Sequence, residues 1–164
     1  MKELLEKISS YNVFNYLLPG VLFVVILDKL TIYSFIQENL IIGGFVYYFI
    51  GLVISRFGSL VIEPLLVNVK FVRFALYADF VSASKKDEKI EILSEVNNMY
   101  RTLCSLFILL LLLLGYQSLQ LHIPVLGRWN PYFATVLLIL MFLLSYRKQT
   151  AYVRKRIETN KGSV

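Results

Sequence analysis

GLVISRFGSLVIEPLL, residues 51–66, is an apolar run that contains one arginine and one glutamate. A charged side chain inside a lipid-buried helix is costly, so Arg56 and Glu63 raise the question of where this segment lies. The whole chain has 164 residues, of which 57% are hydrophobic and only 17% are charged, and its mean hydropathy is +0.65. A soluble domain of this size needs more polar residues to cover its surface. The composition therefore predicts a single structural unit that is integrated in a membrane.

Four uncharged segments are long enough to cross a membrane: Ile8–Leu27, Asn39–Ser55, Thr102–Leu121 and Asn130–Tyr146. A spanning helix needs about 20 apolar residues, within a range of roughly 17–25. The third segment includes the run LFILLLLLL, residues 106–114, which has no polar face and so argues against a soluble helical bundle. Pro19 and Gly20 interrupt the first segment, which also lacks a cleavage site and so is not a signal peptide. We therefore predict an all-α, polytopic membrane protein with four transmembrane helices.

Lysine and arginine residues are concentrated on one side of these segments, and the positive-inside rule places that side in the cytoplasm. The opposite side carries only Lys29 and Arg128. Both termini and the long middle loop are therefore predicted to be cytoplasmic, and the net charge of +6 needs no nucleic-acid partner to explain it. The cytoplasmic residues that we predict to contact a partner or lipid headgroups are Lys70, Arg73, Lys85, Lys86, Arg147, Lys148, Arg154, Lys155 and Arg156.

The chain divides into four parts by composition. Residues 1–57 hold an interfacial helix over Met1–Ser10 and the first transmembrane pair, and residues 58–101 form a cytoplasmic helical layer. Residues 102–146 hold the second transmembrane pair, and residues 147–164 form a basic cytoplasmic helix or tail. Apolar residues continue from Phe57 to Val81, which predicts that the layer has its own core, within one subunit or between several. Ser84 is predicted to cap a helix that runs directly into the third span.

Small residues recur on one face of the second helix. Gly44, Gly51 and Gly58 stand seven residues apart, and Ser55 lies near them. In lipid, small residues on one face let helices approach closely. This pattern predicts close helix packing, either within one subunit or between the subunits of a homo-oligomer.

Arg56, Glu63 and Lys70 recur with the same spacing on another face. At 1.5 Å per residue, Arg56 lies about 25 Å from Asn39, near the inner edge of a hydrocarbon core roughly 30 Å thick. Glu63 lies about 36 Å along and so falls beyond the core. Charges two turns apart do not bridge directly, so each is predicted to pair with a neighbouring helix or to reach the interface by snorkelling. Pro64 predicts a bend just below the membrane.

Two sites have alternative interpretations. Arg56 is either a structural anchor at the inner interface or part of an ion path or ligand site. Asp28 and Lys29, near the outer end of the first helix, either both lie at the outer interface or place Asp28 on a central path in an oligomer.

The sequence contains no hydrolase, phosphate-binding or dinucleotide-binding motif. His122, the only histidine, falls in a short outer loop, and Cys104, the only cysteine, is predicted to be a buried apolar filler in the third span. We therefore predict a protein that is not an enzyme and that has no cofactor and no metal site.

Three stretches carry a resemblance to a known group of proteins: YNVFNYLLPG at residues 11–20, GLVISRFGSLVIEPLL at residues 51–66 and NNMYRTL at residues 97–103. In these pieces and in its layout, the chain resembles the small four-helix membrane proteins encoded beside bacterial anti-phage systems. Examples are the Kiwa-type membrane component and CRISPR-linked accessory membrane proteins. The resemblance implies an oligomeric component of the bacterial inner membrane that senses or perturbs the membrane and works with a cytosolic partner protein. It supplies no catalytic residues.

The apolar 57–81 stretch and the basic C-terminal helix are larger than a membrane anchor needs. They favour a homo-oligomeric defence component that contacts membrane lipids and binds a cytosolic protein. Arg56, Asp28 and Pro64 leave an ion channel or transporter subunit as the alternative. A structural anchor for a neighbouring complex is the second alternative.

Overall fold

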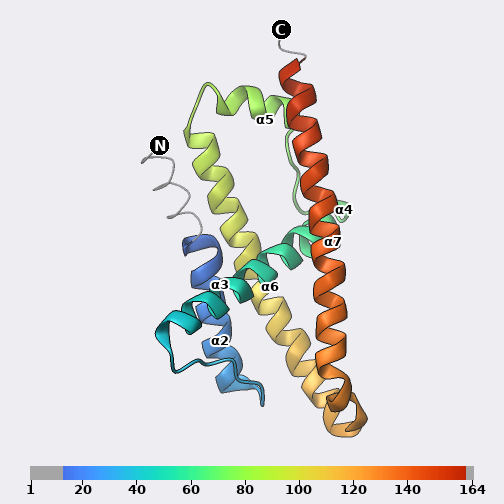
Figure 1. The fold of residues 1–164 in the computed structure, drawn as a ribbon. Coiled ribbons are helices and arrows are strands. Elements are labelled where there is room, and N and C mark those ends of the chain that lie inside the picture. The colour runs from blue at the N-terminus through green and yellow to red at the C-terminus, as the bar shows by residue number, and fades with distance from the viewer. Residues whose placement is uncertain (1–12, 162–164) are drawn as a thin grey trace.

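The computed structural model describes residues 13–161, and all regular structure in this part of the chain is helical (Figure 1). Two short π-helical turns, named η1 and η2, continue directly into α-helices, so that the elements join into five helices. In chain order the elements are η1 (Val13–Leu17), α2 (Leu18–Leu30), α3 (Leu40–Phe57), η2 (Gly58–Ile62), α4 (Glu63–Asn68), α5 (Tyr77–Ser84), α6 (Lys89–His122) and α7 (Val125–Lys161).

Three of these helices are long and apolar enough to cross a membrane. They are the α3–η2–α4 helix with 29 residues, α6 with 34 residues and α7 with 37 residues. The prediction of long apolar helices is thus confirmed for the second, third and fourth segments. The first predicted segment, Ile8–Leu27, begins outside the described residues, and its described part forms η1 and α2. The predicted interfacial helix Met1–Ser10 lies wholly outside them.

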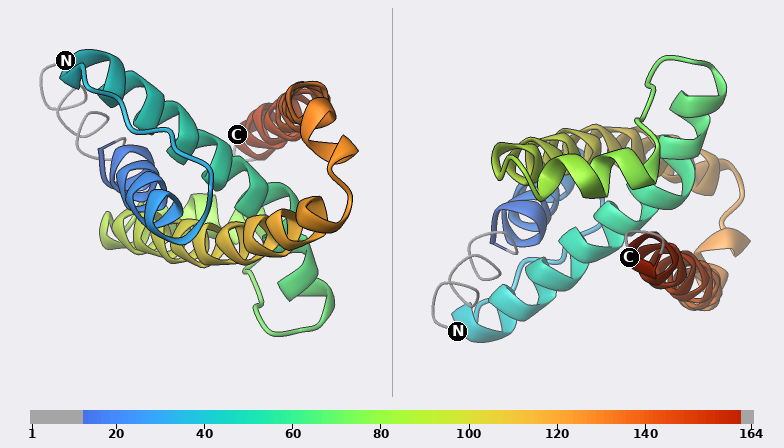
Figure 2. Two further views of the ribbon diagram at one scale, coloured as in Figure 1. Left: turned by 90° about the horizontal axis from the view of Figure 1, so that it is seen from below. Right: turned by 90° about the horizontal axis from the view of Figure 1, so that it is seen from above.

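The core of the bundle lies between α2, α3 and α6. Figure 2 shows α3 running obliquely between α2 and α6 on one side and α7 on the other. No residue of α7 is buried, so this helix contributes nothing to the core. The buried core side chains are Phe23, Leu27, Ile54, Leu106 and Leu110.

Hydrogen bonds near the 122–125 turn join α6 to its neighbours. The Tyr33 hydroxyl, in the loop between α2 and α3, donates to Gln120 Oε1 at 2.5 Å. The Tyr116 hydroxyl donates to Asn130 Oδ1 on α7 at 2.6 Å. Burial, and then the nearby Tyr116, raise the pKa of Tyr33, so this phenol stays protonated and remains a donor at neutral pH. The loop end of the bundle is therefore tied together by side chains, while α5 lies at the opposite end (Figure 1).

Two glycines let the first and second helices pack backbone against backbone. A Cβ on Gly20 would overlap the carbonyl oxygen of Tyr47, and a Cβ on Gly51 would overlap the carbonyl oxygen of Tyr16. Any larger residue at either position would push the helices apart.

The small residues predicted to form a packing face differ in their surroundings. Gly51 and Ser55 are buried, and a Cβ on Gly58 would overlap the Ser105 hydroxyl on α6. A Cβ on Gly44 would meet open space. Three of the four residues therefore pack inside one chain, and assembly of a homo-oligomer through this face stays a prediction.

Within one chain, the segment after α4 does not form the core predicted for the cytoplasmic layer, and a core between subunits stays a prediction. Val81 is 2% exposed, but Phe71 is 78%, Phe74 is 58% and Leu76 is 74% exposed. The reason is geometric: residues 69–76 form a turn and an extended link, and the described helices leave most of their apolar side chains exposed. Lys70 lies in this turn with φ 60° instead of sharing a helix face with Glu63.

Two local predictions were wrong. Ser84 is the last residue of α5 and caps no helix, because α6 begins only at Lys89. The helix that follows does run unbroken into the third span, as expected. Cys104 is exposed and is therefore not a buried filler, because it lies on the side of α6 that faces away from the core.

Alanine at Gly51 should lower the melting temperature of the detergent-solubilised protein, because the added Cβ would force α3 away from η1. Overpacking of this kind costs about 1–3 kcal/mol. Thermal unfolding followed by circular dichroism measures the effect.

Gly44→Ala is the matched control, on the same helix but facing open space. Alanine favours a helix over glycine by about 0.5–1 kcal/mol, so this variant should melt at the same temperature or higher. An equal decrease in melting temperature for Gly44→Ala and Gly51→Ala would contradict the close approach of the helices at Gly51.

Candidate functional site

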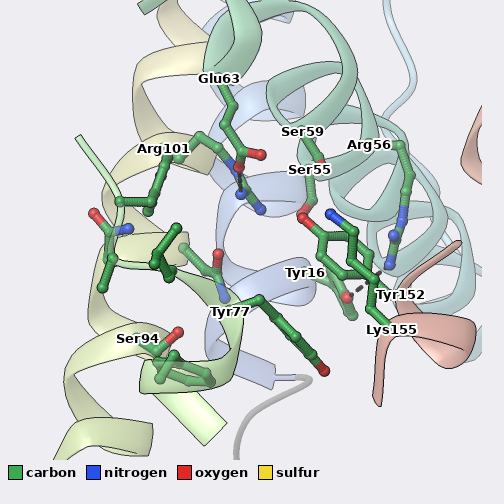
Figure 3. Close-up of a pocket in the computed structure, with 16 residues that line it drawn as sticks. Tyr16, Ser55, Arg56, Ser59, Glu63, Tyr77, Ser94, Arg101, Tyr152 and Lys155 are labelled. Carbon is green, nitrogen blue, oxygen red and sulfur yellow. Dashed lines mark hydrogen bonds and ion pairs between the residues drawn. The ribbon is translucent and has the colours of Figure 1, made fainter. Parts of the chain in front are cut away.

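Glu63, the first residue of α4, forms ion pairs with charged side chains of two other helices. The Nζ of Lys148 on α7 lies 2.9 Å from Glu63 Oε1. Nη1 of Arg101 on α6 pairs with the other carboxylate oxygen, Oε2. Figure 3 shows Glu63 and Arg101 pointing toward one another. We call these three residues the Glu63 cluster.

The backbone before Glu63 offers a hydrogen-bond acceptor to Lys148. In an α-helix the Ser59 carbonyl would accept the amide N–H of Glu63. In η2 that N–H bonds to the Gly58 carbonyl instead, and Pro64 has no N–H to offer. Ser59 therefore lacks its α-helical donor, and Lys148 Nζ donates to its carbonyl at 2.7 Å and to its Oγ at 2.8 Å. The π-helical turn and the proline together create an acceptor for α7.

The Glu63 cluster is largely shielded from solvent. The exposed fractions of the side chains are 16% for Glu63, 19% for Arg101 and 27% for Lys148. The ammonium of Lys148 uses its three protons on three acceptors, so it is fully satisfied. Removing one partner would leave a charge without compensation in a place where water screens it poorly. Since α7 buries no residue, these bonds supply most of the polar contact that holds it against the α3–η2–α4 helix.

A cavity of about 580 Å³ lies beside the cluster. Its walls come from η1, the α3–η2–α4 helix, α5 and the link before it, α6 and α7 (Figure 3). Phe74, Leu76 and Phe80 form an apolar side. Hydroxyl and amide groups line the rest, among them Ser55, Ser59, Tyr77, Ser94, Asn97 and Asn98.

Positive charge dominates the cavity. Arg56, Arg101 and Lys155 line it, and among its lining residues Glu63 is the one carboxylate. The Arg56 guanidinium donates to the Tyr16 hydroxyl at 3.4 Å, which is the long limit of a hydrogen bond (Figure 3). A polar, cationic recess of this size can bind an anionic group.

The structure brings only some of the predicted site residues together. Arg56, Glu63 and Lys155 line the cavity, and Lys148 bonds to Glu63. Asp28 and Lys29 are exposed at the end of α2, far along the chain from this site. Outside the cavity, and exposed, are Lys70, Arg73, Lys85, Lys86, Arg147, Arg154 and Arg156.

Sequence reasoning missed the principal partner of Glu63 and the aromatic lining. Arg101 is one of the many cations on the side predicted to be cytoplasmic, and it directly precedes the uncharged third segment. That position, at the edge of a span, was the available signal, because Arg56 occupies the same kind of position on the second helix. Tyr16 and Tyr152 gave no comparable signal, since tyrosines are frequent in this chain.

Replacing Lys148 with glutamine should loosen α7 from α3. The rings of Phe49 on α3 and Phe142 on α7 lie 6.1 Å apart, so a cysteine pair at these positions reports the contact. In a Cys104→Ser background a short bifunctional maleimide should cross-link the pair readily, and Lys148→Gln should slow the cross-linking and lower the stability by about 1–3 kcal/mol.

Arg147→Gln is the matched control, because Arg147 neighbours Lys148, carries the same charge and is exposed. It should leave both the cross-linking rate and the melting temperature unchanged. Equal cross-linking in the two variants would show that the cluster does not hold α7 in place.

Among residues 13–161, no group of three or more His, Cys, Asp or Glu side chains could hold a metal ion. No family model, no curated protein and no solved structure matches the chain. What the protein does must therefore be inferred from its own residues and their arrangement.

Proposed function

We propose that the protein is a multi-pass component of the bacterial inner membrane that holds a partner protein at the cytoplasmic face. It has four transmembrane helices, with both termini and α5 in the cytoplasm. The observation that carries this proposal is an uncovered apolar stripe on the part of α6 that extends beyond the membrane.

The depth of the membrane follows from the Glu63 cluster. At 1.5 Å per residue, Glu63 lies about 35 Å from the start of its helix at Leu40. Arg101 lies about 32 Å from the end of α6, and Lys148 lies about 35 Å from the start of α7. Along α6 and α7 these distances slightly exceed a hydrocarbon core of roughly 30 Å, whereas the oblique α3 crosses less depth than its length (Figure 2). Three charged residues from three helices meet at one depth, and we place the inner boundary of the hydrocarbon core at that depth.

Two helices extend well past this boundary. At 1.5 Å per residue, the 34 residues of α6 span about 51 Å and the 37 residues of α7 span about 56 Å. Each therefore carries about 20 Å of helix that a membrane anchor does not need. α5 packs against these extensions, with the rings of Tyr77 and Tyr152 6.2 Å apart.

The extension of α6 presents apolar side chains that nothing in the described chain covers. Leu93 is 66% exposed, Val96 is 37% and Tyr100 is 64% exposed. The spacings of three and four residues place them on one helical face. Because this face lies beyond the proposed boundary, lipid cannot cover it, and a protein partner would. The exposed basic residues of the α7 extension, Arg154 and Arg156, add a charged surface nearby.

The resemblance to membrane components of anti-phage systems agrees with this arrangement and makes such a system the proposed setting. In that setting the partner is either a cytosolic defence protein or another copy of the chain. A channel is favoured only by the cationic cavity. Directly beyond the cavity the bundle is filled by the apolar core, so a conducting path would have to run between copies. A structural anchor for a neighbouring complex, the second alternative, would also hold a partner protein at the membrane.

A photo-cross-linking amino acid at Leu93 should capture a protein in cells that express the chain at its native level. The apolar stripe would place a partner against this position, so a cross-linked product heavier than the monomer is expected on a denaturing gel. A differently tagged second copy, expressed together with the first, distinguishes a homo-oligomer from another protein.

Leu121 provides the control, because it is an equally apolar and 72% exposed residue at the other end of α6. It should give no protein product there, since the proposed orientation places it at the outer surface. If the two positions give the same products, or Leu93 gives none, α6 does not hold a partner.

A further inference from the structure

We propose that the cavity beside the Glu63 cluster binds a phosphate group, carried by an anionic lipid headgroup or by a soluble phosphate compound. Nothing in the proposed partner-binding role requires such a ligand. The inference rests on the balance of charge in the cavity, on two guanidinium groups in its lining, and on an apolar wall beside the charges.

The charges around the cavity do not cancel. Among the described residues that line the cavity, Glu63 is the one carboxylate, and both of its oxygens are already engaged, one by Arg101 and one by Lys148. Arg56 and Lys155 also line the cavity, and neither forms an ion pair with any described residue. Arg56 is half-buried and Lys155 is exposed. Unpaired cations that line one recess repel one another, and a bound anion would relieve that repulsion.

Two guanidinium groups, those of Arg56 and Arg101, contribute to the cavity lining. One nitrogen of Arg101 already pairs with Glu63. Among the described residues, the guanidinium of Arg56 forms one hydrogen bond, the long one to the Tyr16 hydroxyl. Two guanidinium groups facing one recess are well suited to phosphate oxygens, which accept several charge-assisted hydrogen bonds.

The apolar wall indicates what else the ligand carries. Phe74 and Leu76 line the cavity, yet they are 58% and 74% exposed, so the wall continues to the surface of the molecule. A volume of about 580 Å³ is within the range of about 300–1,000 Å³ that small-molecule sites occupy. A phosphate next to an apolar surface is the chemistry of a phospholipid at the membrane boundary. The phosphate site does not depend on the proposed orientation. The choice of a lipid as its ligand does, because that orientation places the cavity at the inner headgroups.

Calorimetry on the detergent-solubilised full chain can test the site with three probes. These are a short-chain phosphatidylglycerol, its water-soluble headgroup glycerophosphoglycerol, and inorganic phosphate. Arg56→Gln and Lys155→Gln should each weaken binding about tenfold, as expected for the loss of one charge-assisted hydrogen bond. Arg73→Gln and Arg156→Gln remove exposed cations outside the cavity and should leave binding unchanged.

Each outcome has a consequence for the proposal. Binding of phosphatidylglycerol alone assigns the lipid source, and equal binding of the free headgroup or of phosphate assigns the soluble source. No binding of any probe, or equal losses in the cavity variants and the controls, would overturn the site. Lys155 is exposed, so its substitution should not disturb folding. If Arg56→Gln is unstable, the binding measured with Lys155→Gln tests the site. Failed cross-linking at Leu93 would remove the partner role but would leave these binding results intact.

Discussion

A carboxylate on a long apolar helix needs compensating charges, and Glu63 obtains them from two other helices. This requirement links parts of the chain that are far apart in the sequence. α6 must present Arg101 and α7 must present Lys148 at the same depth as the end of η2. The π-helical turn and Pro64 strengthen the link, because they free the Ser59 carbonyl for the lysine. Because α7 buries no residue, we expect loss of the Glu63 cluster to weaken its packing against the α3–η2–α4 helix.

Much of the helical fold followed from the sequence, because long uncharged runs have few alternatives. The helix that begins after Asn39 is an example: this side chain accepts hydrogen bonds from the N–H groups of Ile41 and Ile42, as an N-cap does. The cross-helix role of Glu63 was also foreseeable, since an isolated charge beside an apolar segment needs a partner. Its identity was not, because helix spacing says which residues share a face but not which helices become neighbours.

The failures have a common physical cause. Apolar residues between Phe57 and Val81 were expected to form a core within one subunit or between several. Within one chain they do not, because a helix that ends at Asn68 and an extended link cannot fold back on themselves over so short a distance. A core between subunits stays a prediction. Similarly, seven-residue spacing placed Gly44 with Gly51, although α2 and η1 approach α3 only along part of its length. Periodicity predicts the shape of one helix, whereas the π-helical turn, the cavity and the contacts of α7 depend on tertiary packing.

The uncovered surface of the chain has two parts that call for different surroundings. Most of α7 exposes leucine, isoleucine and phenylalanine, as a lipid-facing helix does. The stripe on α6 lies beyond the Glu63 cluster, and in the proposed orientation we expect a protein to cover it. This division depends on one claim, that the cluster marks the inner boundary of the membrane. It also determines whether the cationic cavity lies among phospholipid headgroups.

Spin labels placed one by one along residues 140–156 of α7, in liposomes and a Cys104→Ser background, test that claim most directly. Oxygen collides preferentially with labels in lipid, and a water-soluble nickel complex collides with labels in water. If the cluster marks the boundary, the ratio of the two collision rates should change from lipid-like to water-like within one turn of Lys148. A transition more than two turns away, or no transition at all, would contradict the account.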